Sequence, residues 1–277
     1  GMLISAENMV KVDDVRKVGD VILHHVTGGV LRRGDHVKGI IDEERRWSLM
    51  RHHTATHILL HASKEVLGAH IHQAGAQKGP ESSRLDIRHY KHITPDELRK
   101  IEIAANRMVM ADLPIDVKYL DRTKAEQMYG FSLYQGGVPP GKEIRVVRVA
   151  GDVEVCAGTH CRSTGDVGFI KVIRVEHIQD GIERLEFAAG LAAVEYVHRI
   201  EKILSGSAEI LSVQNEYLPA TVNRFFSEWK AQKKEIERLR QRIAELEKKS
   251  LAAEVVGNTP VLVRRIDLSG KELATIG

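Results

Sequence analysis

Two short stretches of the chain place histidine and cysteine at the spacing of metal ligands. His53 and His57 stand four residues apart, and Cys156 and His160 have the same spacing in a second stretch further along the chain. Residues four apart on a helix share a face, so the first two imidazoles can hold one ion between them. Three nitrogens and one sulfur are donors suited to tetrahedral Zn2+, and the pattern therefore predicts one zinc ion per chain.

Each half of this constellation also has an ordinary explanation. The chain contains 14 histidines, and a histidine pair on a helix often does no more than form hydrogen bonds with water or neighbours. A lone cysteine is more often a small buried hydrophobe than a ligand. Two further residues have similar positions: His61 continues the four-residue row from His57, and Cys161 adjoins His160. Spacing alone therefore leaves the ligand set open.

The elements that must position these residues can be predicted from local signals. A helix is expected over residues 42–67, with Asp42 as N-cap, Glu43 and Glu44 in the first turn, and no Pro or Gly before Gly68. The second stretch forms an Ala-Gly bend between strand-like runs. Another helix is expected from Pro95 to about residue 111, because Thr94 and Glu97 form a capping box.

The remaining pattern predicts an α+β fold, in which helices cover one face of a mostly antiparallel sheet. Short strand-like runs separated by turn residues suggest a small β-structure over residues 1–41. Later runs of the same kind are expected to form the sheet, and they lie at 69–77, 85–87, 115–120, 144–149, 153–155, 167–175 and 182–188.

The composition shifts after Gly190. Residues 191–204 are predicted to form a helix. Further along, apolar residues follow a 3-4 heptad register that the polar Gln232 interrupts. The apolar residues of this register are Val222, Phe225, Trp229, Ile236, Leu239, Ile243 and Leu246. This register predicts a helical hairpin or a coiled-coil homodimer through residues 222–246. The charged residues around it are most simply a solvated face, although they could also lie along RNA. A strand is expected to begin at 261–266.

Composition sets broad limits on function. The chain has 277 residues, of which 43% are hydrophobic and 29% charged, as in a soluble globular protein of about two domains. No apolar run reaches the roughly 20 residues of a membrane span, and no signal peptide opens the chain. Two cysteines, one of them suited to a metal, indicate a reducing cytoplasm. A net charge of +3 does not by itself indicate nucleic acid.

Four motifs in this order resemble the editing domain of alanyl-tRNA synthetases of the archaeal type. They are RHHTATHILL at 51–60, VLGAHIHQ at 66–73, CAGTH at 156–160 with Thr164-Gly165, and GIERLE at 181–186. The resemblance extends from about residue 20 to 190. It implies a zinc-dependent hydrolase that removes serine or glycine wrongly esterified to the 3′ acceptor end of alanine tRNA.

Carried over residue by residue, the resemblance makes His53, His57, Cys156 and His160 the ligands and excludes His61 and Cys161. It places a substrate-contacting glutamine at Gln73. Ala157 departs from the family, which usually has a second glycine there, but alanine can make the bend if its φ is negative. The position of the Glu of HExxH peptidases is occupied by Thr54, which weighs against a peptidase. Thr54, Thr56 and Thr159 are candidate catalytic hydroxyls, although each more simply packs beside the ligands.

The resemblance also organises the chain as a C-terminal fragment of a longer enzyme. It implies a partial β-barrel over 1–41, a zinc-containing editing domain over 42–190, a helical or coiled-coil region over 191–255 and the start of a further domain over 256–277. Nothing in the sequence resembles an ATP-binding aminoacylation domain. Two alternatives remain open: a free-standing editing hydrolase that acts in trans, and a zinc-stabilised tRNA-binding and dimerisation module without activity.

Overall fold

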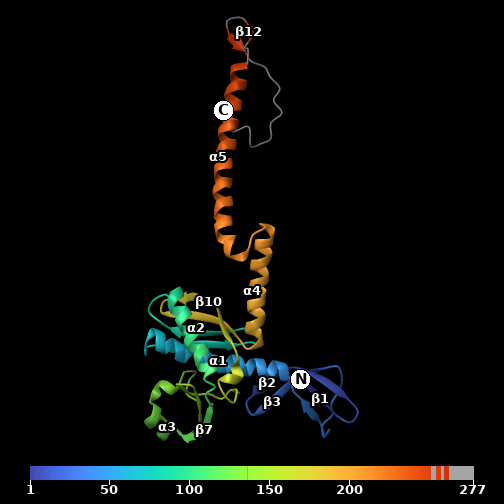
Figure 1. Ribbon diagram of the computed structural model, residues 1–277. Coiled ribbons are helices and arrows are strands. Elements are labelled where there is room, and N and C mark those ends of the chain that lie inside the picture. The colour runs from blue at the N-terminus through green and yellow to red at the C-terminus, as the bar shows by residue number, and fades with distance from the viewer. Residues whose placement is uncertain (136, 251–253, 257–258, 262–277) are drawn as a thin grey trace. The chain divides into compact units, whose positions relative to one another are not determined.

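The computed structural model describes residues 1–135, 137–250, 254–256 and 259–261 (Figure 1). The chain divides into two units, Gly1–Arg199 and Ile200–Gly277. The described helices are α1 (Glu43–Leu67), α2 (Pro95–Met110), α3 (Arg122–Tyr129), α4 (Leu191–Ile210) and α5 (Leu218–Ser250), with 3-10 turns at Phe131–Leu133, Gly165–Val167 and Asn215–Tyr217. None of these helices is long and apolar enough to cross a membrane.

The first strands form an antiparallel sheet with the order β3-β2-β1-β4. Its strands are β1 (Met2–Ile4), β2 (Met9–Val18), β3 (Val21–Thr27) and β4 (Lys38–Ile40). The expected strands are present, although β2 is longer than predicted and β1 is additional. That these strands belong to a barrel stays a prediction.

The second sheet has the order β10-β11-β6-β5, and every pairing in it is antiparallel. Its strands are β5 (His72–Lys78), β6 (Ser83–Arg88), β10 (Ile170–Gln179) and β11 (Ile182–Ala189). Alternate residues point to opposite faces, so Leu85, Leu185 and Phe187 lie on the buried face. The outer face is charged, and Arg184 there forms an ion pair with Asp86.

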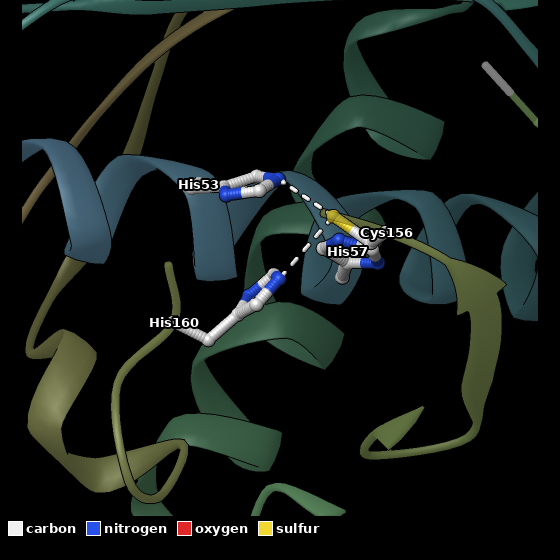
Figure 2. A group of neighbouring side chains, drawn as sticks. All are labelled: His53, His57, Cys156 and His160. Atoms are coloured by element: carbon white, nitrogen blue, oxygen red, sulfur yellow. Dashed lines mark hydrogen bonds between the residues drawn. The ribbon is translucent and has the colours of Figure 1, made fainter. Parts of the chain in front are cut away.

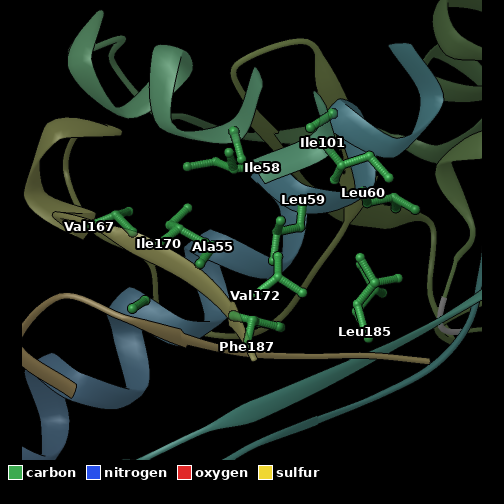
Figure 3. Close-up of a cluster of buried hydrophobic side chains, with 14 of the residues drawn as sticks. Ala55, Ile58, Leu59, Leu60, Ile101, Val167, Ile170, Val172, Leu185 and Phe187 are labelled. Carbon is green, nitrogen blue, oxygen red and sulfur yellow. The ribbon is translucent and has the colours of Figure 1, made fainter. Parts of the chain in front are cut away.

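Helices α1 and α2 pack together with the buried face of this sheet in one hydrophobic core. Figure 3 shows Ala55 and Leu59 of α1 among Val172 and Phe187 of the strands. The predicted helix ends are confirmed, because the Asp42 side chain accepts a hydrogen bond from the Arg45 N–H, and Gly68 follows the last helical residue. This core fixes α1, the helix that carries the first pair of histidines.

A third sheet leads into the second pair of candidate ligands, because its last strand ends directly before Cys156. It consists of β7 (Asp116–Asp121), β8 (Glu143–Val149) and β9 (Asp152–Val155) in that order, all antiparallel. Its buried residues Ile144 and Val146 form a smaller core with Ala125 and Leu133. The predicted α+β class with antiparallel sheets is therefore confirmed, with the strands divided between separate sheets.

The second unit contains the C-terminal half of α4 and the whole of α5. Helix α5 spans the predicted heptad register and is longer than expected, as is α4, which was predicted to end at residue 204. A short hairpin pairs β12 (Glu254–Val256) with β13 (Thr259–Val261). The strand expected over 261–266 lies outside the described residues except for its first position, and the four-part domain assignment stays a prediction.

Candidate metal centre

The structure brings His53, His57, Cys156 and His160 together, with one donor atom from each within 4.8 Å of the others (Figure 2). The two histidines at 53 and 57 project from adjacent turns of α1. The Cys156 Sγ lies just after β9 and is 3.3 Å from His53 Nε2 and 3.4 Å from His160 Nε2. The folded chain thus brings the two stretches together, as the sequence predicts.

The Nδ1 atoms of the three histidines are oriented by other groups of the chain. His53 Nδ1 is 3.2 Å from the Thr159 carbonyl oxygen, and His57 Nδ1 is 2.9 Å from Asp152 Oδ2. His160 Nδ1 is 3.5 Å from Thr54 Oγ1. A second contact of this kind sets the tautomer of a ligating imidazole and leaves Nε2 for a metal.

The bend between Cys156 and His160 needs glycine at one position. A Cβ at Gly158 would lie within 2.5 Å of His53 Nδ1 and closer still to Cε1 of the same ring. Only a residue without a side chain lets this backbone approach His53. Ala157 is not among the residues with positive φ, so the departure from the family pattern does not strain the bend.

The cluster holds Cys156 and His160 in the protonation states of ligands. Burial opposes ionisation of Cys156, but hydrogen bonds from His160, His53 and His57 lower the pKa of its thiol to about 3. Burial, with the charges of His57 and His53, lowers the pKa of His160 to about 4. A thiolate and a neutral imidazole are the forms that bind metal ions.

Negative charge is concentrated behind His57. Burial opposes its protonation, yet the hydrogen bond to Asp152, the contact with Cys156 and the charge of Glu154 raise the pKa of His57 to about 10. Asp152 also accepts a hydrogen bond from Lys64 Nζ at 2.9 Å. A field that stabilises a proton on His57 would equally stabilise a cation bound in the cluster.

Glu154 is the least satisfied member of this group. Its side chain is buried 3.4 Å from His57 Nδ1, and its Oε1 has no hydrogen-bond partner among the residues that the structure describes. Burial, together with the neighbouring Asp152, raises the pKa of Glu154 to about 8. Asp152 and Glu154 are two residues apart on β9, so their side chains share one face. This pattern stands directly before Cys156 in the sequence, where it could have indicated the two carboxyl groups.

The donor set fits a zinc ion. Three imidazole nitrogens and one thiolate are common zinc ligands, and the oriented Nδ1 contacts supply the outer shell that such sites have. Four protein ligands are also the number found in structural zinc sites, whereas catalytic sites keep a position open. The arrangement is thus chemically suited to anchoring a pocket as well as to catalysis.

The similar residues His61 and Cys161 do not join this cluster in the described part of the chain. His61 Nε2 lies 3.4 Å from Glu65, and Cys161 is buried with its thiol pKa raised by that burial. His52 is likewise structural, because its Nδ1 contacts the Ser48 carbonyl and its Nε2 accepts from the Ala189 N–H of β11.

Two of the three candidate catalytic threonines are engaged within the protein. The Thr54 hydroxyl accepts a hydrogen bond from the Cys161 N–H at 3.1 Å, and the Thr56 hydroxyl donates to the His52 carbonyl at 2.9 Å. Both side chains are buried. Thr159 is exposed and contributes its carbonyl oxygen to the His53 contact. Packing and positioning therefore account for Thr54 and Thr56.

Gln73 lies on β5. Its N–H donates to Gln135 Oε1 at 2.9 Å, and both residues line a pocket of about 420 Å³ that contains none of the four ligands. Lys78, further along β5, interacts electrostatically with the cluster. Burial lowers the pKa of Lys78, while the negative charges of Cys156 and Glu154 act in the opposite direction.

The chain is similar to segments of known tRNA synthetases. Residues 144–186 match the family described as the threonyl and alanyl tRNA synthetase second additional domain, a segment that includes Cys156 and His160. An alanine–tRNA ligase of Methanoregula boonei is 69% identical over 276 residues, covering 100% of this chain. Those of Methanoculleus marisnigri and Methanospirillum hungatei are 64% and 62% identical with the same coverage. The chain spans 30% of the length of each of these relatives.

Proposed function

Because the chain corresponds along its whole length to a segment of the alanine–tRNA ligase family, we propose that it performs an editing reaction, the hydrolysis of seryl or glycyl esters on alanine tRNA. The observation that carries the proposal is the convergence of His53, His57, Cys156 and His160. We further propose that these four residues hold one Zn2+, that the 3′ acceptor end of the tRNA is the partner, and that the reaction takes place in the cytoplasm.

The chemistry required of the site is modest. An aminoacyl ester is already activated, so a positioned water and stabilisation of the developing oxyanion could suffice. Bound zinc would supply positive charge that polarises the ester or the attacking water. The chain's own contribution is to orient the three imidazoles through Thr159, Asp152 and Thr54.

Metal content is the first test of this proposal. Elemental analysis of protein purified without added metal should find one zinc per chain, and His57→Ala or Cys156→Ala should release it. His61→Ala and Cys161→Ala are matched controls that should keep the zinc. A folded wild-type sample with zinc well below one equivalent would contradict the ligand assignment.

Activity is the deciding test. Seryl-tRNA charged on alanine tRNA should be hydrolysed faster than alanyl-tRNA, since a polar group placed for the serine hydroxyl is left unpaired when alanine binds. An unpaired buried polar group costs about 1–3 kcal/mol, or roughly ten- to a hundredfold in rate. His57→Ala should abolish both reactions by dismantling the site.

A tRNA-binding and dimerisation module without activity is the second candidate. The closed set of four protein ligands favours it, because such shells usually stabilise folds. Zinc-loaded protein that binds alanine tRNA but hydrolyses neither ester would support this module and contradict the editing proposal. A free-standing hydrolase acting in trans has less support, since the three relatives named above are ligases of which this chain covers 30%.

A further inference from the structure

We propose that the chain has a second site for a divalent transition-metal cation, formed by His92, His177 and Glu183. These residues come from three places: the loop after β6, the end of β10 and the beginning of β11. One donor atom from each lies within 4.8 Å of the others, and none of the three belongs to the first cluster. The inference is independent of the proposed editing function.

Both histidines converge on a single carboxylate oxygen. His92 Nδ1 is 3.2 Å and His177 Nδ1 is 2.8 Å from Glu183 Oε1, and the two rings pack edge to face with their centroids 4.6 Å apart. Two imidazole nitrogens and a carboxylate oxygen are therefore directed at a small common space. In that space one cation could replace the protons that now join the rings to Glu183.

The strand pairing preorganises two of the three donors. His177 and Glu183 are directly opposite each other in the antiparallel β10–β11 pair, and Glu183 also pairs with Ile87 of β6. Side chains of such cross-strand partners stand on the same face of the sheet, about 5 Å apart at Cβ. Because the backbone of the sheet sets this distance, a bound cation would cost little reorganisation here.

The burial of Glu183 calls for a positive partner. Glu183 shares the buried face of β11 with Leu185 and Phe187, and it is only 2% exposed. In the part of the chain that the structure describes, its ion-pair partners are His92 and His177, with no lysine or arginine among them. A buried carboxylate is costly unless it is paired, and two imidazoles are charged only when protonated. A cation shared by all three residues would satisfy the carboxylate while the rings stay neutral.

The exposed side of the trio gives a cation access from solvent. The His92 side chain is 75% exposed and that of His177 is 40% exposed, so water can complete the coordination. The nearby Asp180 carboxylate lies 3.9 Å from His177 Nε2 and can orient this ring from outside. Mixed imidazole and carboxylate donors suit Zn2+, Ni2+, Co2+ and Cu2+ better than Mg2+ or Ca2+.

Nickel uptake by the full chain tests the site. Protein that has kept its zinc through purification is equilibrated with Ni2+ by dialysis, and both metals are then measured by elemental analysis. The two measurements separate Ni2+ binding at His92, His177 and Glu183 from exchange of zinc at the first cluster. We expect Ni2+ to bind without loss of zinc and to raise the thermal unfolding temperature, because a ligand that binds only the folded state stabilises it.

Variants of the exposed histidines localise the nickel. His92→Ala and His177→Ala should each weaken Ni2+ binding by more than about tenfold, since losing a direct ligand costs at least as much as losing an outer-shell partner. His36→Ala removes an exposed histidine outside both clusters and should bind Ni2+ like the wild type. Circular dichroism confirms folding, and the exposure of His92 makes that variant the safer of the two. The proposal is overturned if wild-type protein takes up no Ni2+, if uptake merely equals zinc release, or if both variants bind Ni2+ unchanged.

Discussion

The Nδ1 atom of His57 lies 2.9 Å from Oδ2 of Asp152, and these side chains are only 3% and 1% exposed. Lys64 donates to the other oxygen of the same carboxylate. The imidazole is therefore held between a buried carboxylate on one side and the cluster of candidate ligands on the other. Such a contact fixes which nitrogen of the ring remains for a metal.

The first prediction follows from this contact. Asp152→Asn keeps the size of the side chain but removes its charge, so zinc affinity should fall about 10- to 100-fold, as is typical when an outer-shell partner is lost. Competition with a chromophoric chelator measures this change. Asp86→Asn, which breaks the ion pair with Arg184 on the outer face of the sheet, is the control and should leave zinc affinity unchanged. Equal affinities for wild type and Asp152→Asn would remove Asp152 from the site.

The second prediction concerns the close approach of Gly158 to His53. In Gly158→Ala the added methyl group would overlap the imidazole, so either the ring or the bend must move, at a cost of about 1–3 kcal/mol. We expect less than one equivalent of zinc and a lower unfolding temperature. Gly206→Ala is the control, because a Cβ there meets no described atom within 4 Å, and alanine favours the helix that contains it. Full zinc occupancy in Gly158→Ala would show that the bend yields without affecting His53.

Helices α1 and α2 could be predicted closely because their ends are encoded locally, in the caps at Asp42 and Thr94. The ligand spacing was equally visible, since it depends on residue types only a few positions apart. The contact of Asp152 with His57 could not be predicted in this way. An alternating Asp-Val-Glu-Val strand is typical of a strand with one solvated face, and only tertiary packing buries the Asp152 side chain against His57. The division of the strands into separate sheets also depends on long-range pairing, which local alternation does not specify.

The third prediction concerns the pH dependence of the cap on α2. Hydrogen bonds from the Thr94 backbone and hydroxyl, with Lys91, lower the pKa of Glu97 to about 2. Since this pKa is below the unfolded value of about 4.3, the stabilising effect of Glu97 is present above pH 4.3 and is lost as the pH falls toward 2. Glu97→Gln should therefore be less stable than wild type at pH 6, and the two should converge near pH 2.

An NMR titration of the Glu97 carboxyl group checks this prediction directly. Thr94→Ala removes the hydroxyl donor and should move the Glu97 pKa back toward its ordinary value. A wild-type pKa near 4.3 would mean that the capping box does not persist in solution.

The fourth prediction is self-association through α5. The apolar side chains of its heptad register are 47–56% exposed, at Val222, Phe225, Trp229, Ile236, Leu239, Ile243 and Leu246. A second copy would cover this stripe, so Leu239→Asp should shift sedimentation equilibrium toward the monomer. Gln241→Asp adds the same charge at an exposed polar position and should leave the sedimentation equilibrium unchanged. A wild-type chain that is strictly monomeric, with no change in Leu239→Asp, would rule out the coiled-coil dimer.

The last prediction concerns the specificity of the proposed editing reaction. Gln73 and Gln135 line the same pocket. The Gln73 backbone N–H donates a hydrogen bond to the Gln135 side chain, which helps to hold the strand in place. The side-chain amide of Gln73 can then bind a ligand. If that amide pairs with the serine hydroxyl, Gln73→Ala should lower kcat/KM for seryl-tRNA about ten- to a hundredfold. The rate for alanyl-tRNA should stay nearly constant, because that ester lacks the hydroxyl.

Gln77→Ala is the matched control for this measurement, since Gln77 is exposed on the same strand and lines a different pocket. Zinc content must be equal in all three proteins, so that the ratio of the two rates reports recognition and not loss of the metal. An unchanged ratio in Gln73→Ala would leave the hydrolase proposal standing but would assign serine recognition elsewhere. Because none of the four ligands lines the Gln73 pocket, Lys78, whose pKa responds to the charge of Cys156, would then be the next residue to test.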